Sequence, residues 1–269
     1  MIDSTSGTVF LACYRAFSDE VPIRRSSKDD KEFHFQNWVA ERIAEAGFSV
    51  LPTKRNSYPD FSLCEYPEGY EVKGLTHPGR QADFDCNSQV AGGYHSGRTI
   101  YYVFGRYPKR VSGNEYQVED MVVCHGDFLN AERNYLHKND SFRGFGSYGD
   151  VLVRDRKMYV APTPYALTEG TVGEFTLIAP SGSRLGQNSE LFQVGELERV
   201  ESDRVVVHYS FDLQKNVLAT GDADNPTAGT VHRFTAYRPK GASDKEVKMK
   251  KSQVPAQLAW SEVSDFQDS

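Results

Sequence analysis

The spacing of apolar and polar residues predicts a helix in the first fifty residues of the chain. Over residues 32–46 the apolar side chains recur every three or four positions, as on the buried face of a helix. Asp29 or Asp30 can cap the start of this helix, and Gly47 fits its end. The shorter apolar stretch at residues 8–14 is interpreted as an arm or strand, followed by an exposed connection.

A hairpin and a buried strand are predicted next. Residues 61–64 and 70–75 each alternate between apolar and polar side chains, and the turn between them contains proline and glycine. The continuous apolar run at residues 99–105 is typical of a central strand buried on both faces. Further strands are expected at residues 119–124, 174–179, 191–194, 204–211 and 231–237, and a short helix at 127–135. The order of elements favours an α/β fold with a β-rich C-terminal part.

Composition narrows the class of protein without naming a function. Of the 269 residues, 39% are hydrophobic, which is enough for a packed core, and the formal net charge is -6. A globally basic nucleic-acid coat is excluded, but an enzyme with a local positive surface is not. The four cysteines have neither CxxC nor zinc-finger spacing, and no run approaches the ~20 apolar residues of a membrane span. We therefore expect reduced cysteines, a cytoplasmic location and no membrane partner.

Three polar side chains in the predicted hairpin form the strongest chemical signal. Glu71 and Lys73 are two residues apart on one strand and should project from the same face. If Asp60 begins the antiparallel partner strand, its carboxylate converges on the same place. Such a cluster is costly without a cation. Mg²⁺ prefers oxygen ligands and retains waters, so it is the expected ion, with Mn²⁺ as a possible substitute.

The pattern Pro59-Asp60, ten residues, then Glu71-Val72-Lys73 resembles the motif of the PD-(D/E)xK nuclease superfamily, which includes type II restriction endonucleases. The resemblance covers roughly residues 31–125. It implies a restriction-endonuclease-like core with a mixed central β-sheet flanked by helices, and metal-dependent hydrolysis of phosphodiester bonds. Asp60 and Glu71 would hold the metal, and Lys73 would orient or activate the attacking water.

Two further catalytic candidates come from the same resemblance. Many members carry a glutamate on the preceding helix, and Glu41 matches it as a supporting metal ligand. Some branches place a glutamine and a tyrosine after the lysine strand, and Gln89 and Tyr94 resemble that pair with a different spacing.

Plainer interpretations stay open for the cluster itself. Asp60 is also a typical turn residue after proline. Glu71 and Lys73 could form the solvent face of an ordinary strand, and Glu41 could be a surface residue.

The expected organisation has three parts. Residues 1–30 form an N-terminal arm and residues 31–165 the nuclease core. Residues 166–269 form a β-rich part for DNA recognition or dimerisation, ending in a polar tail. Candidate DNA-binding residues are basic or amide side chains beside glycines and aromatics: Lys54, Arg55, Asn56, Arg98, Arg106, Arg143, Arg154, Arg156 and Lys157. Each such cluster could also be solvated surface.

The sequence thus predicts a magnesium-dependent endonuclease that cuts double-stranded DNA at a short sequence, as in restriction–modification. Cutting both strands favours a homodimer. No nucleotide-binding loop is seen, so no nucleotide cofactor is expected. One alternative is a modification-dependent or structure-selective nuclease of repair or phage defence, with an aromatic cage from Tyr209, Phe211, Phe234 and Tyr237. The other is a non-catalytic DNA-binding protein.

Overall fold

The computed structural model describes residues 4–25, 33–52, 57–86, 89–109, 113–130, 159–185, 190–212 and 217–250. The side chains at 33, 159–160, 206–212 and 217–222 are outside the description. Several predictions therefore lie outside the described residues: the polar C-terminal tail and the DNA-binding candidates Lys54, Arg55, Asn56, Arg143, Arg154, Arg156 and Lys157.

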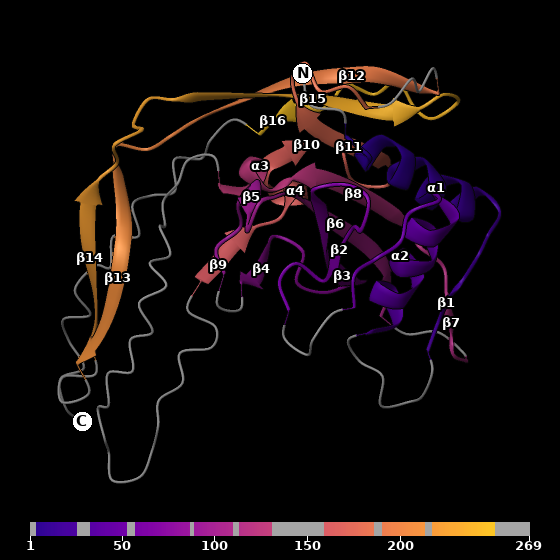
Figure 1. Cartoon of the computed structure of the whole chain (residues 1–269), viewed down its shortest axis with the longest axis horizontal. Helices are drawn as coiled ribbons and strands as arrows, with labels where there is room; N and C mark the ends of the chain where they lie inside the picture. The colour runs from indigo at the N-terminus through magenta and orange to yellow at the C-terminus, as the bar shows by residue number, and fades with distance from the viewer. Residues whose placement is uncertain are drawn as a thin grey trace, which may run out of the picture.

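An eight-stranded mixed sheet forms the centre of the molecule (Figure 1). Its strands lie in the order β12 (Leu191–Val200), β15 (Val231–Pro239), β11 (Phe175–Pro180), β8 (Asp120–His125), β6 (Arg98–Pro108), β3 (Glu68–His77) and β2 (Phe61–Ser62), and β5 (Tyr94–His95) also pairs with β6. The pairs β3–β6 and β8–β11 are parallel, and the other neighbours are antiparallel. The fold is α/β, with a mixed multistranded sheet and few helices.

Two helices cover one face of this sheet, α1 (Ser6–Ser18) and α2 (Phe33–Glu45). The prediction of a helix over residues 32–46 is confirmed by α2. The prediction of an arm or strand at residues 8–14 is wrong, because this stretch lies in the middle of α1. Val9, Phe10 and Cys13 of α1 are buried against α2 and the sheet. A helix buried nearly all round has a continuous apolar run instead of a helical period.

Shorter elements lie over the opposite face. They are α3 (Gly126–Asn130), α4 (Pro164–Leu167) and the antiparallel pair β4 (Asp83–Cys86) and β9 (Tyr159–Pro162). Phe128 of α3, Tyr165 of α4 and Phe84 of β4 pack with Phe104 of the sheet in a second apolar core. The sheet therefore separates two cores, and β6 contributes to both, as its continuous apolar run predicts.

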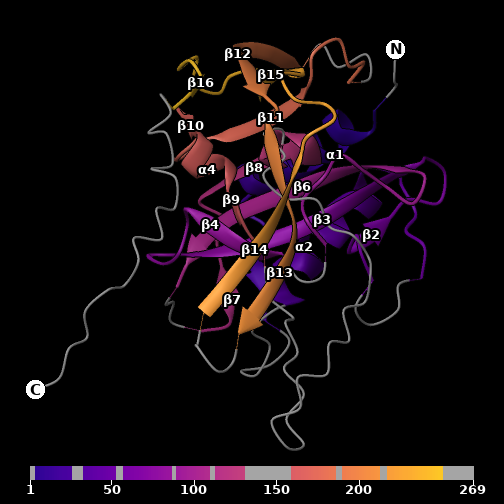
Figure 2. The same ribbon diagram turned by 90° about the vertical axis from the view of Figure 1, so that its left-hand side faces the viewer.

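The β-rich part is continuous with the core. Strands β11, β15 and β12 join the sheet through β8, so the expected boundary near residue 165 falls within one connected sheet. The hairpin β13 (Arg204–Asp212) and β14 (Val217–Asp224) projects away from the body (Figure 1), and Figure 2 shows it from its own side. Two small antiparallel pairs complete the description, β1 (Ile23–Arg24) with β7 (Glu115–Tyr116) and β10 (Thr168–Glu169) with β16 (Lys248–Met249).

The structure also bears on disulfide bonds and on membrane-spanning helices. The four cysteines are free, as expected; Cys64 is exposed and the other three are buried. Within the described ranges, no helix has the length and apolar character needed to cross a membrane.

Candidate active site

The pairing of β2 with β3 brings Asp60 next to Glu71. Phe61 is opposite Tyr70, so the residue before the first strand faces the residue after Tyr70. The backbone N–H of Asp60 donates to Oε2 of Glu71 at 3.1 Å, and the backbone N–H of Val72 donates to Oδ2 of Asp60 at 2.8 Å. Each carboxylate thus accepts a hydrogen bond from the backbone of the other strand, which fixes the two side chains together.

Lys73 completes the cluster from the same strand. Its Nζ donates to Oε1 of Glu71 at 2.7 Å, with 25% of the Lys73 side chain exposed and 11% of that of Glu71. Burial opposes the charge on Lys73, but the Glu71 carboxylate and its hydrogen bond outweigh burial and raise the pKa of the lysine. Lys73 is therefore a cation at neutral pH.

The parallel register with β6 identifies the face on which the cluster lies. Glu71 is opposite Tyr102 and Lys73 opposite Phe104, and both aromatic side chains belong to the core on the α3–α4 side. Val72, between them in sequence, packs into the core under α1 and α2. Glu71 and Lys73 therefore point away from the two long helices, toward the face with the shorter elements.

The local sequence explains why Asp60 is held so close to β3. A Cβ atom at Gly69 would lie only 2.5 Å from Cγ of Pro59, so glycine lets Pro59 pack directly on the strand. The turn between β2 and β3 is tied down by Arg98, whose Nη1 donates to the carbonyl oxygens of Leu63 and Tyr66 at 2.8 and 3.0 Å. The turn and the close approach of Pro59 together set the position of the Asp60 carboxylate.

The cluster carries more negative charge than it can balance. Burial, and next the charge of Glu71, raise the pKa of Asp60 to about 7, although the hydrogen bond from Val72, the charge of Lys73 and a hydrogen bond from Gln36 lower it. Two carboxylates and one ammonium leave a formal charge of -1 in a partly dehydrated place. A cation bound between Asp60 and Glu71 would relieve this repulsion.

The donor set suits a hard cation with few protein ligands. No group of three or more His, Cys, Asp or Glu side chains is arranged to hold a metal ion in the part of the chain that the structure describes. Mg²⁺ sites often use only one or two carboxylates, with waters and substrate phosphates as the other ligands. Asp60 and Glu71 fit this arrangement, and Zn²⁺ with nitrogen or sulfur ligands does not.

The helix residue at the site is Gln36, and sequence reasoning missed it. The Gln36 side chain hydrogen-bonds to the Asp60 carboxylate. Glu41 instead has 67% of its side chain exposed and pairs with Nη2 of Arg42 at 3.1 Å. Positions 36 and 41 of α2 are five steps apart along the chain, which places them about 140° apart around the helix axis at 3.6 residues per turn. Gln36 is therefore the α2 residue that reaches Asp60, and Glu41 lies on another side of the helix.

The other described candidates are engaged elsewhere. Gln89 is half-buried, and its amide donates to the carbonyl of Val90 at 3.3 Å, a local contact. Tyr94, on β5, is 71% exposed. Arg106 is 6% exposed, and its Nε donates to Oδ1 and Oδ2 of Asp120 at 2.8 Å. A guanidinium buried and paired in this way is not available to a DNA phosphate.

The two cage candidates whose side chains the structure describes, Phe234 and Tyr237, do not come together. Phe234 packs in the core with α3, whereas Tyr237 packs against the core on the α1–α2 side of the sheet. The side chains of Tyr209 and Phe211 are outside the description. Phe234 and Tyr237 are therefore core residues on opposite faces of β15.

Comparisons with known proteins add no family. No family model matches the chain, and neither a curated protein nor a solved structure matches it. The geometry and charge of the site are therefore what point to a function.

Proposed function

We propose that this protein is a magnesium-dependent endonuclease with a restriction-endonuclease-like core, cutting double-stranded DNA in the cytoplasm. The observation that carries the proposal is the cluster of Asp60, Glu71 and Lys73 at the β2–β3 edge of the sheet, held together by hydrogen bonds within and between these two segments. An ordinary strand surface does not explain why two carboxylates are placed side by side with backbone hydrogen bonds that lock them there. With a divalent cation held by the two carboxylates, such a site would suit the negative charge and the oxygen atoms of a phosphodiester.

The residues divide the chemistry between them. Asp60 and Glu71 would hold the ion, and Gln36 and the Val72 N–H orient the Asp60 carboxylate. A bound Mg²⁺ would supply charge stabilisation for the phosphate and a lower pKa for its water. Lys73 is held by Glu71 and keeps its proton, so it orients the attacking water and stabilises negative charge, and it is not the base.

A short recognition sequence and a homodimer are further parts of the proposal. The chain holds one such cluster among its described residues, and cutting two antiparallel strands symmetrically needs two sites related by a two-fold axis. The β-rich part contains strands and a projecting hairpin that are not part of the site. These elements could recognise the DNA sequence or contact a second copy of the chain.

The test is incubation of the purified protein with unmethylated phage DNA, in Mg²⁺ or in EDTA, with the products separated on a gel. We expect discrete fragments in Mg²⁺ and intact DNA in EDTA. Asp60→Ala should abolish cleavage while DNA binding is kept. Asp19→Ala, a change of an exposed residue at the end of α1, is the matched control and should cut like the wild type.

The other outcomes separate the alternatives. A metal-dependent smear would keep the nuclease and remove sequence specificity. Cleavage only of methylated or branched DNA would favour the modification-dependent or structure-selective enzyme. No cleavage of any of these substrates, with DNA binding unchanged in Asp60→Ala, would replace the proposal with a non-catalytic DNA-binding protein.

A further inference from the structure

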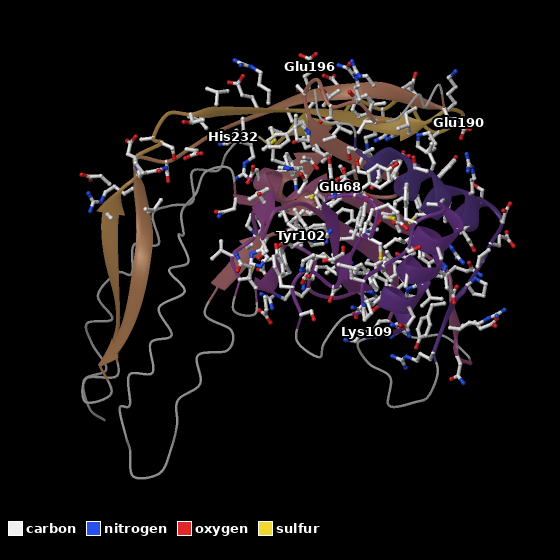
Figure 3. All side chains as sticks on the ribbon, viewed as in Figure 1. Glu68, Tyr102, Lys109, Glu190, Glu196 and His232 are labelled. Atoms are coloured by element: carbon white, nitrogen blue, oxygen red, sulfur yellow. The ribbon has the colours of Figure 1, made fainter. Side chains whose placement is uncertain are left out.

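A pair of tyrosine hydroxyls lies beside the carboxylate cluster. The Oη atoms of Tyr58 and Tyr102 are 2.9 Å apart, close enough for a hydrogen bond in which either can donate. Tyr102 is opposite Glu71 in the register of β3 and β6, and Tyr58 comes two residues before Asp60. Figure 3 shows Tyr102 in the body of the molecule, well away from the projecting hairpin. The pair therefore belongs to the same face as the candidate site.

The two tyrosines differ in their access to a ligand. Tyr102 is 1% exposed, whereas Tyr58 is only half-buried. Two hydroxyls joined by one hydrogen bond have two protons, of which the bond uses one. When the enclosed Tyr102 donates to Tyr58, the Tyr58 proton stays available to a further acceptor. A hydrogen bond received by a hydroxyl also makes that hydroxyl a stronger donor.

The surroundings hold Tyr58 in place and keep its proton on. Its ring meets that of His95 edge-on, with centroids 4.9 Å apart and an interplanar angle of 85°. Burial, partly offset by the bond to Tyr102 and reinforced by the charge of Glu71, raises the pKa of Tyr58 well above its usual value. Burial and the neighbouring Tyr58 likewise raise the pKa of Tyr102. A tyrosine hydroxyl with its ordinary pKa of about 10 already keeps its proton at neutral pH, so both hydroxyls are available as donors there.

We propose that Tyr58 donates a hydrogen bond to a non-bridging oxygen of the phosphate bound at Asp60 and Glu71, and that Tyr102 positions the Tyr58 hydroxyl for it. This inference rests on the proposed nuclease function. Negative charge on the non-bridging oxygens grows as the water attacks, so a neutral donor stabilises the transition state more than the bound substrate. No proton is transferred in this contact. Tyr58 is thus a catalytic residue and Tyr102 a positioning residue.

The test is single-turnover cleavage of DNA in Mg²⁺ by four variants: Tyr58→Phe, Tyr102→Phe, the double variant and Tyr14→Phe. Phenylalanine keeps both rings and removes only the hydroxyl. Tyr14, packed against Phe175 on the α1–α2 side, is the matched control. DNA affinity in Ca²⁺ and Mn²⁺ affinity are measured in parallel, and thermal unfolding checks that each variant folds.

We expect Tyr58→Phe to lower the cleavage rate about 100- to 1000-fold, the range seen when one preorganised transition-state donor is removed. Both affinities and the control should stay within about twofold. Tyr102→Phe should lose less, and the double variant should lose no more than Tyr58→Phe, because Tyr102 acts through Tyr58.

Two results would overturn the inference while the nuclease proposal survives. One is an active wild type with Tyr58→Phe within twofold of it. The other is a double variant whose loss is the product of the two single losses, since that would show independent packing effects. A wild type that cuts no DNA removes both the function and this role, and so differs from either result.

Discussion

Replacing Asp60 by asparagine should stabilise the metal-free protein, although it destroys the site. The carboxylate costs stability because it is partly dehydrated and lies next to Glu71. Asparagine has nearly the same shape, and its carbonyl oxygen can still accept the hydrogen bond from the Val72 N–H. The change therefore removes the charge and keeps the packing.

The size of the stability gain expected for Asp60→Asn follows from the pKa of Asp60. A rise from 3.8 to about 7 corresponds to about 4 kcal/mol of lost stability when the group is fully ionised. Asp60 is only partly buried, and solvent screening reduces this to about 2 kcal/mol. For a chain of this length, we expect the melting temperature of Asp60→Asn to exceed that of the wild type by roughly 4–8 °C at pH 8.

The stability gained by Asp60→Asn over the wild type should increase as the pH rises. The pKa of Asp60 is higher in the folded protein than in the unfolded chain, so the folded state binds the proton more tightly. Wild-type stability therefore falls as the pH rises from about 4 to about 7, and the deficit is complete above pH 7. Asp60→Asn has no such deficit, so the difference should be near zero at pH 4 and full at pH 8.

The assay is thermal or urea unfolding between pH 4 and pH 8 in EDTA, repeated with Mg²⁺. Saturating Mg²⁺ should raise the wild-type melting temperature and leave Asp60→Asn almost unchanged, because a bound ion stabilises only the state that binds it. Asp224→Asn, at a carboxylate with 91% of its side chain exposed, is the control and should show neither effect. A gain that is equal at pH 4 and pH 8 would refute the electrostatic reasoning, and equal responses to Mg²⁺ would refute the metal site.

Two further predictions test how the site is built. Gln36→Ala should lower the cleavage rate about tenfold, the value of one hydrogen bond to a charged group, whereas Glu41→Ala should stay within about twofold in the same kinetic assay. Gly69→Ala should cost about 1–3 kcal/mol of unfolding free energy and most of the activity, because its Cβ would press on Pro59. Gly92→Ala, where a Cβ would meet nothing within 4 Å, should change neither; a Gly69→Ala enzyme as active as the wild type would contradict the proposed role of the close approach.

The elements that sequence reasoning predicted are those with a clear local period. Helix α2 has one apolar stripe over thirteen residues, and the hairpin β2–β3 has alternation on both sides of a proline–glycine turn. The hairpin places Asp60, Glu71 and Lys73 together because a tight turn fixes which residues lie opposite each other. The core of the site was therefore predictable, because all three residues lie within fourteen positions of the chain.

Other elements gave no local signal. Helix α1 is buried nearly all round, so its apolar run resembled a strand. Strand β4 alternates over only four residues, and its partner β9 lies more than seventy residues later, so no turn between them marked it as a strand. On α2, the choice between Gln36 and Glu41 depended on the phase of the helix relative to the site, which requires the position of the sheet. Arg106 was placed among DNA contacts for its charge, because its buried partner Asp120 is not identifiable from the sequence.

The register of the parallel pair β3 and β6 is the part of the site that the sequence could not predict. No tight turn joins two parallel strands, so nothing in the local sequence sets which residue of β6 lies opposite Glu71. A shift of one residue would bring Tyr101 or Val103 to that place and turn the Tyr102 hydroxyl toward the helices. The alternation in β3 therefore predicts which of its own side chains point together, but the partner of Tyr58 follows only from the register. For this reason the Tyr58 and Tyr102 variants test the structure itself, and not the motif.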